Sequence, residues 1–164
     1  PLALHDALPI WAAEWLRESG ASHMLLLHGD LPCLRQEHVL QLAAGLDRTP
    51  RPLVRLVPDR RGEGTNGLLC TLPSPIRFHY GEYSLAAHRE ACRRRQVTVE
   101  QMEISGMGLD VDTPADLQML LAQGGAGDRT TRFLSESDVP LRLRQMQRGA
   151  TAGASPCVMK LAVK

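Results

Sequence analysis

The chain has 164 residues, 43% of them hydrophobic and 23% charged, which is an ordinary composition for a globular domain with its own core. The formal net charge of +1 excludes a global electrostatic attraction to nucleic acid or to a membrane surface. The apolar runs are too short to span a bilayer and no signal-peptide pattern is present, so we expect a cytoplasmic protein that binds neither nucleic acid nor membrane.

The four cysteines are too widely spaced for a CxxC zinc or redox motif. They are Cys33, Cys70, Cys92 and Cys157. Cytoplasmic cysteines are usually reduced, and we expect most of these to pack as small hydrophobic side chains.

The first half of the chain predicts two helices and two strands. Apolar residues at helical spacing predict a helix over residues 6–19, and a continuous apolar run predicts a buried parallel strand over residues 24–27. A second amphipathic helix is expected over residues 36–46, and an alternating strand over residues 53–57. The apolar residues that recur at helical spacing in the first helix are Leu8, Trp11, Ala12, Trp15 and Leu16.

The second half begins with a loop, residues 58–67, that is rich in turn-forming residues. Extended segments and helices then follow in alternation. The extended segments are expected over residues 68–72, 76–78 and 97–104, and the helices over residues 84–95 and 114–122.

This alternation predicts an α/β fold, a three-layer sandwich with a mostly parallel sheet, in which residues 1–123 form one domain. The composition changes at Gly124, where a Gly-Gly-Ala-Gly run predicts a flexible break. Residues 124–164 are expected to be a poorly ordered tail. The alternative for this tail is a docking arm for a neighbouring subunit, which leaves a homo-oligomer open.

Asp30 lies just beyond the carboxyl end of the first predicted strand, where open α/β sheets present ligands. Three interpretations of this position are open. Asp30 could cap the helix that follows, bind a metal ion, or accept a phosphoryl group.

Asp110 and Asp112 are two residues apart in a segment expected to be extended, so their carboxylates can point to the same side. Two such carboxylates repel each other unless a cation lies between them. Mg²⁺ binds through a few carboxylates together with substrate phosphates, and Asp30 can supply a third carboxylate. The neighbouring Thr113 and Asp116 are expected to form a capping box with Pro114 at the first helical position, which leaves the two aspartates available for the metal.

Two glycine-containing loops are candidates for anion binding. In the first, Gly64, Thr65 and Asn66 lie among glycines that let backbone N–H groups approach an anion closely, although a plain turn is the alternative. In the second, Gly81 precedes Ser84, which begins a helix whose N-terminus favours an anion; Ser84 as a simple N-cap is the alternative.

Taken together, four motifs resemble the CofC/FbiD guanylyltransferases of coenzyme F-420 biosynthesis in their order and approximate spacing. They are His28-Gly29-Asp30-Leu31-Pro32, Gly64-Thr65-Asn66, Tyr80-Gly81 with Ser84 and His88, and the run from Leu109 to Leu117. The resemblance covers residues 12–123, and no family counterpart is expected for the segment that follows.

The resemblance implies a MobA-like, Rossmann-related nucleotidyltransferase fold and transfer of GMP from GTP to a small phosphorylated carboxylate, with release of pyrophosphate. The acceptor is phosphoenolpyruvate, 2-phospho-L-lactate or 3-phospho-D-glycerate. Asp30, Asp110 and Asp112 are implied to bind Mg²⁺ and to be catalytic. Thr65, Gly81 and Ser84 are implied to hold the acceptor, beside Gly64 and Asn66.

One departure from the family concerns the start of the chain. Such folds carry the guanine and triphosphate contacts on an N-terminal strand–loop–helix with basic residues, and no such unit precedes Asp6, so we expect that unit to be missing. The only lysines are Lys160 and Lys164. The alternatives are therefore a MobA-like transferase acting on a molybdopterin or a sugar phosphate, and a non-catalytic fragment that keeps only the acceptor pocket.

Overall fold

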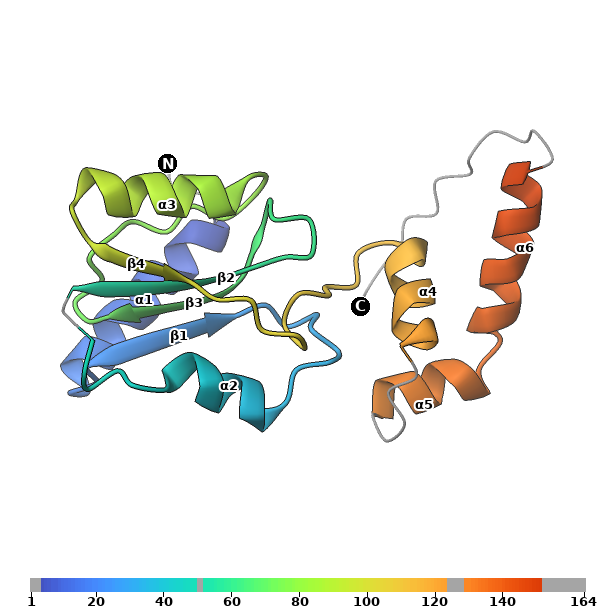
Figure 1. Ribbon diagram of the computed structural model, residues 1–164, viewed down its shortest axis with the longest axis horizontal. Coiled ribbons are helices and arrows are strands. Elements are labelled where there is room, and N and C mark those ends of the chain that lie inside the picture. The colour runs from blue at the N-terminus through green and yellow to red at the C-terminus, as the bar shows by residue number, and fades with distance from the viewer. Residues whose placement is uncertain (1–3, 50–51, 124–128, 152–164) are drawn as a thin grey trace. The chain divides into compact units, whose positions relative to one another are not determined.

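The computed structural model of the chain describes residues 4–49, 52–123 and 129–151, with side chains from residue 7 to residue 148 within those ranges. The chain divides into two compact units, Pro1–Asp112 and Thr113–Lys164. Each unit has its own arrangement of elements (Figure 1). No helix in the described ranges combines the length and the apolar character that crossing a bilayer requires.

The first unit contains helices and strands in alternation, close to the boundaries that the sequence predicts. They are α1 (Leu4–Glu18), β1 (His23–Leu27), α2 (Gln36–Ala43), β2 (Leu53–Pro58), β3 (Thr65–Thr71), α3 (Ser84–Arg94) and β4 (Thr98–Gln101). Thr65 to Gly67 belong to β3 rather than to the preceding loop, and residues 76–78 are not a strand.

The four strands form one mixed sheet in the order β1-β3-β2-β4. β3 is antiparallel to both of its neighbours, β1 and β2, and only the β2–β4 pair is parallel. The prediction of a mostly parallel sheet is therefore wrong. Residues 59–64 form too short a connection for a parallel crossover, so β2 and β3 must form a hairpin.

The sheet is covered on both faces, which confirms the prediction of three layers. Consecutive residues of a strand point to opposite faces of the sheet, and Leu68 and Leu69 on β3 accordingly belong to two different core clusters. The first cluster includes Ala13 of α1 and Leu85 of α3, and the second includes Leu42 of α2. In Figure 1, α3 lies above the sheet and α2 lies below it.

The first helix turns a different side to the core from the one its large residues suggest. Trp11 and Trp15 are 66% and 57% exposed, and Leu8 is exposed as well, whereas the small Ala13 is buried against the sheet. Ile10, Ala12 and Leu16 are partly buried and pack against the same core cluster. A small residue on the inward face lets the helix axis approach the strands. Because this helix has apolar residues on both sides, the sequence does not predict which side faces the core.

Cys70 and Cys92 are buried in the first core cluster, which confirms that they pack as small hydrophobic side chains. Burial disfavours the thiolate and raises the pKa of each thiol to about 11. Cys33 is half-buried. Cys157 lies outside the described residues.

The second unit consists, in its described residues, of three helices that pack on one another: α4 (Pro114–Ala122), α5 (Arg129–Glu136) and α6 (Val139–Thr151). The predicted capping box begins α4, since Thr113 Oγ1 accepts from the Asp116 N–H and Asp116 Oδ2 accepts from the Thr113 N–H.

The helices α5 and α6 differ from the poorly ordered tail expected after Gly124. They bury Leu134 and Leu143, and both helices pack on α4, in which Leu120 is buried. The parts of the expected tail at residues 124–128 and 152–164 lie outside the described residues.

Arg55 on β2 joins three elements of the first unit. Its side chain is buried, and its Nε donates to Glu100 Oε2 of β4 at 2.7 Å. Its Nη1 donates to the carbonyl oxygens of Leu42 and Ala44 at 2.8 and 2.6 Å, which satisfies carbonyls at the C-terminal end of α2.

We predict that Arg55→Met lowers the free energy of unfolding by about 3 kcal/mol, because Glu100 and the α2 carbonyls lose their buried partner. Urea denaturation measures this change. The matched control is Arg93→Met, which removes an ion pair with Glu90 from a side chain that is 74% exposed. That variant should unfold like the wild type, and equal destabilisation by both would contradict the role of Arg55.

Candidate functional site

A cavity of about 500 Å³ opens in the first unit where β1 ends and β3 begins. All eight residues that the sequence singles out for metal or acceptor binding line it. The full lining comprises His28, Asp30, Asp59, Arg61, Glu63, Gly64, Thr65, Asn66, Gly81, Glu82, Tyr83, Ser84, Asp110 and Asp112. Residues from four separate stretches of the chain therefore meet at one place.

The reversed direction of β3 brings the first two of these stretches together. Because β3 runs opposite to β1, its first residues lie beside the last residues of β1, with Leu27 opposite Gly67. The His28 N–H then donates to the Asn66 carbonyl oxygen at 3.1 Å, beyond the end of the β1 ladder. The polar turn after β1 is in this way attached directly to the Thr65–Asn66 segment.

Backbone hydrogen bonding also brings Asp30 beside the Asp110–Asp112 segment. The Val111 N–H donates to the Asp30 carbonyl oxygen at 3.3 Å. Asp30 does not cap α2, whose N-cap residue is Arg35. The capping interpretation of Asp30 is therefore wrong, while its position on the cavity is the one that the metal interpretation requires.

Asn66 connects the beginning of β3 to the segment that carries Asp110. Its side chain is buried, and Nδ2 donates to the Met107 carbonyl oxygen at 3.0 Å and makes a longer contact of 3.4 Å with Asp110 Oδ1. These contacts give Asn66 a structural task that the sequence does not predict. The amide also keeps the Asp110 carboxylate, which is half-buried, at the edge of the cavity.

Two glycines allow the same segment to approach its neighbours. A Cβ on Gly67 would lie 2.6 Å from Met107 Cε, so the glycine leaves room for the Met107 side chain against β3. A Cβ on Gly106 would collide with the imidazole of His38 and the carbonyl oxygen of Cys33. Gly106 is therefore required where the segment leading to Asp110 packs against the α2 region.

The hairpin loop at residues 59–64 forms another wall. Asp59 Oδ1 accepts from the Glu63 N–H at 2.8 Å, and the Asp59 side chain lies 3.1 Å from the Cβ position of Gly64. The Glu63 carbonyl oxygen accepts from the Leu85 N–H at 3.1 Å, which connects the loop to the first turn of α3. Gly64 thus allows close packing within the loop.

The N-terminus of α3 faces the cavity through Gly81, Tyr83 and Ser84. Gly81 has φ of +123°, and the N-cap residue is Tyr83 with φ of 58°. Ser84 is therefore not the N-cap, and its hydroxyl lies 3.4 Å from Thr65 Oγ1 instead. Thr65 Oγ1 also lies 3.0 Å from Nδ1 of the fully buried His88.

Negative charge dominates the cavity, since six of its fourteen lining residues are aspartates or glutamates and one is an arginine. An anionic substrate therefore needs a cation to enter. Within the described ranges, no three His, Cys, Asp or Glu side chains are gathered closely enough to form a complete metal site. Three aspartates beside one cavity fit Mg²⁺ only as a partial oxygen donor set, to which substrate phosphates add ligands.

Several lining residues were missed at the sequence level, among them His28, Arg61 and Glu63. Arg61 supplies a cation to this cavity, whose described lining includes no lysine. The signal was present, because Arg61 lies in the same turn-rich loop as Gly64. The sequence could not show that its side chain lines the cavity.

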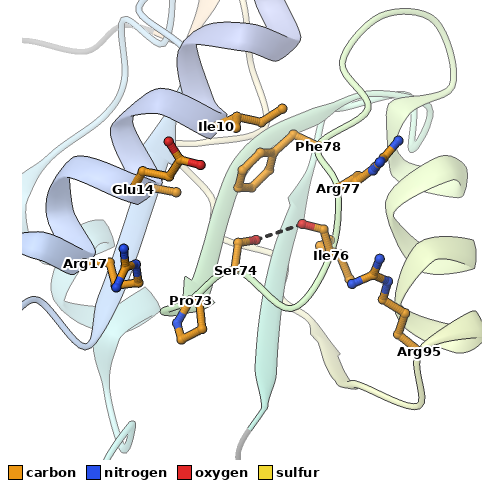
Figure 2. Close-up of a pocket in the computed structure, with 10 residues that line it drawn as sticks. Ile10, Glu14, Arg17, Pro73, Ser74, Ile76, Arg77, Phe78 and Arg95 are labelled. Carbon is orange, nitrogen blue, oxygen red and sulfur yellow. Dashed lines mark hydrogen bonds between the residues drawn. The ribbon is translucent and has the colours of Figure 1, made fainter. Parts of the chain in front are cut away.

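A second cavity in the first unit, of about 540 Å³, has a different character (Figure 2). Ile10, Pro73, Ile76 and Phe78 give it an apolar lining, and Ser74 Oγ donates to the Ile76 carbonyl oxygen at 2.9 Å. It shares no residue with the carboxylate-lined cavity and contains none of the predicted site residues. The candidate site is therefore the carboxylate-lined cavity.

Residues 12–151 match the family model described as guanylyl transferase CofC like. The chain belongs to this family. The match confirms the resemblance drawn from the four motifs, and it extends through α5 and α6, where no family counterpart was expected.

Curated relatives carry two different acceptor names. A phosphoenolpyruvate guanylyltransferase of Conexibacter woesei is 44% identical over 124 residues, which cover 73% of this chain and 55% of that protein. A 3-phospho-D-glycerate guanylyltransferase of Colwellia psychrerythraea is 33% identical over 109 residues, which cover 66% of this chain and 50% of that protein. The chain thus spans about half the length of these relatives.

A solved structure confirms the fold class. The crystal structure described as a nucleotide-diphospho-sugar transferase of Desulfovibrio desulfuricans G20 aligns with a TM-score of 0.67 and 21% identity. The alignment covers 88% of this chain and 63% of that one. At this identity the likeness shows a shared α/β fold and nothing about substrate.

We predict that Gly106→Ala lowers the free energy of unfolding by about 1–3 kcal/mol, because the added methyl group displaces His38 or the Cys33 backbone. It should also shift the amide resonances of Asp110 and Asp112. The matched control is Gly108→Ala in the same segment, where no atom lies within 4 Å of the Cβ position. Similar urea midpoints and spectra for both variants would contradict the close-packing role of Gly106.

Proposed function

We propose that this chain belongs to a cytoplasmic, Mg²⁺-dependent guanylyltransferase that transfers GMP from GTP to a small phosphorylated carboxylate in coenzyme F-420 biosynthesis, releasing pyrophosphate. The observation that carries the proposal is the meeting of Asp30, Asp110 and Asp112 with Thr65, Gly81 and Ser84 on one cavity. Membership of a guanylyltransferase family supports the reaction type.

The charge of the cavity supports the metal requirement. GTP and a phosphorylated acid are both anions, and the six lining carboxylates would repel them in the absence of a cation. Asp30, Asp110 and Asp112 would hold Mg²⁺, with phosphate oxygens completing its coordination. When bound, the ion would neutralise charge on the phosphates and polarise the phosphorus that is attacked.

Other lining residues of the cavity offer groups suited to the acceptor. Thr65 and Ser84 present hydroxyl groups, and the N-terminus of α3 adds the positive end of the helix dipole. Arg61 provides a guanidinium group on the same cavity. These groups can bind a phosphate or a carboxylate of the acceptor, with Gly64 and Asn66 shaping the surface beside them.

The proposed reaction needs no covalent protein intermediate. An oxygen of the acceptor phosphate attacks the α-phosphorus of GTP, the bond from that phosphorus to the bridging oxygen breaks, and pyrophosphate leaves. The protein has to bring two anions together in line and reduce their repulsion. A cavity lined by both carboxylates and hydrogen-bond donors can serve this purpose, because the carboxylates would hold the cation and the donors would hold the acceptor.

The guanine and triphosphate contacts are proposed to require polypeptide beyond the described residues. The chain spans about half the length of its curated relatives, so the remaining half of such a protein is available to supply them. The test of function therefore includes a full-length relative as a reference.

The test measures pyrophosphate release with Mg²⁺ and GTP, separately with phosphoenolpyruvate, 2-phospho-L-lactate and 3-phospho-D-glycerate. It is run on this chain and on the full-length Conexibacter relative. Release by this chain with one acceptor supports the proposal and identifies the acceptor. Release by the relative alone rejects independent activity of this chain, and favours a fragment that keeps only the acceptor pocket. Turnover with a molybdopterin or a sugar phosphate instead would reject the proposed acceptor class.

We predict that Asp30→Asn and Asp112→Asn each weaken binding of Mn²⁺, used as a paramagnetic probe for Mg²⁺, by on the order of tenfold or more. Line broadening of amide signals around residues 28–30 and 110–112 measures this without any need for turnover. Asp47→Asn is the control, because its side chain is 79% exposed and does not line the cavity. Unchanged broadening in the Asp30 and Asp112 variants would reject the metal assignment.

A further inference from the structure

Four buried polar side chains lie at the carboxylate-lined cavity or directly behind it. Thr65, Asn66, Ser84 and His88 are each at most 3% exposed. Asn66 is accounted for by its bonds to the Asp110 segment. Thr65, Ser84 and His88 form a separate connected group, in which Thr65 Oγ1 contacts both of the others.

The backbone fixes the tautomer of His88. The His79 N–H donates to His88 Nε2 at 3.0 Å. An amide N–H can only donate, so Nε2 must be the unprotonated, accepting nitrogen. The ring proton is therefore on Nδ1, which donates to Thr65 Oγ1 at 3.0 Å.

The tautomer of His88 determines whether the hydroxyl groups of Thr65 and Ser84 can donate hydrogen bonds to a ligand. Because Nδ1 already carries a proton, neither Thr65 nor Ser84 can donate to the imidazole. The two hydroxyls share one contact of 3.4 Å, and whichever of them donates in it, the proton of the other is left over. Within the described ranges, the structure shows no other hydrogen-bond partner for either hydroxyl.

The leftover proton has one evident destination, since Thr65 and Ser84 both line the cavity. The opposite tautomer would reverse this arrangement. Thr65 would donate to Nδ1 and accept from Ser84, and no hydroxyl proton would remain for a ligand. An anion needs donors, so the Nδ1–H tautomer is the one that suits a phosphate or carboxylate.

We propose that His88 is a positioning residue that, as its Nδ1–H tautomer, holds the Thr65–Ser84 pair as a hydrogen-bond donor to an anionic group in the cavity. The identification of that anion with the phosphate or carboxylate of the acceptor rests on the proposed function. His88 itself lies behind Thr65 and is fully buried, so it acts through Thr65.

The first measurement is the tautomer itself. Long-range ¹H–¹⁵N spectra of the labelled 164-residue chain distinguish a protonated from an unprotonated ring nitrogen. We expect protonated Nδ1 and unprotonated Nε2 for His88 in the wild type. The Nε2–H tautomer would overturn the inference, whether or not the chain has any enzymatic activity.

The second measurement is a double-mutant cycle on anion binding, with inorganic phosphate and phosphoenolpyruvate as probes in the presence of Mg²⁺. Thr65→Val and His88→Phe should each weaken phosphate binding by about tenfold, which is typical of losing one hydrogen bond to a charged group. In the Thr65→Val background, His88→Phe should have no further effect, because its target is gone. Additive losses would show that His88 acts by another route and would overturn the proposal.

Two further variants separate positioning from packing. His88→Asn keeps an N–H donor close to the Nδ1 position and should restore phosphate binding to within about threefold of the wild type. Cys92→Ala, one turn further along α3 and fully buried, should lower stability but leave phosphate binding unchanged. An Asn variant that binds no better than the Phe variant would overturn the proposal, as would a loss of binding in the Cys92 variant equal to that of His88→Phe.

Failure of this inference is distinguishable from failure of the proposed function. No phosphate binding by the wild-type chain would overturn the inference directly. Phosphate binding with the expected coupling, but without pyrophosphate release by either this chain or the full-length relative, would keep the role of His88 and reject the guanylyltransferase assignment.

Discussion

The direction of a single strand organises the candidate site. β3 lies between β1 and β2 and runs opposite to both, so its first residues lie where β1 and β2 end. This places Thr65 and Asn66 between the turn that carries Asp30 and the hairpin loop that carries Asp59 and Arg61. A parallel strand at this position would have put Thr65 at the far end of the sheet, away from every aspartate of the site.

Buried polar groups then convert this topology into a defined surface. Asn66 attaches the Asp110 segment to β3, and His88 attaches Thr65 to α3, each through hydrogen bonds in a part of the molecule from which water is largely excluded. A buried polar group left without a partner is costly, so each of these contacts restricts the conformations available to the walls. The cavity consequently presents the hydroxyl groups of Thr65 and Ser84 together with its carboxylates.

The comparisons and the geometry contribute different parts of the functional argument. Family membership supplies the reaction class, and the names of the relatives leave more than one acceptor open. The cavity supplies what those names do not, namely which side chains meet and with what charge. The excess of carboxylates supports the proposed need for a cation, and Thr65, Ser84 and Arg61 are the groups proposed to hold a small anion.

Local sequence patterns determined the helices and strands of the first unit, the capping box at Thr113, and the candidate site residues. Each of these depends on neighbours within a few positions, such as the spacing of Asp110 and Asp112 or the sequence Thr-Pro-Ala-Asp. Strand direction, the inward face of α1 and the packing of α5 and α6 were decided only by tertiary structure, because they depend on which apolar surfaces meet. The same holds for the structural task of Asn66 and the place of His88 behind Thr65. Their partners are 41 and 23 residues away in the chain, and no local pattern identifies contacts over that distance.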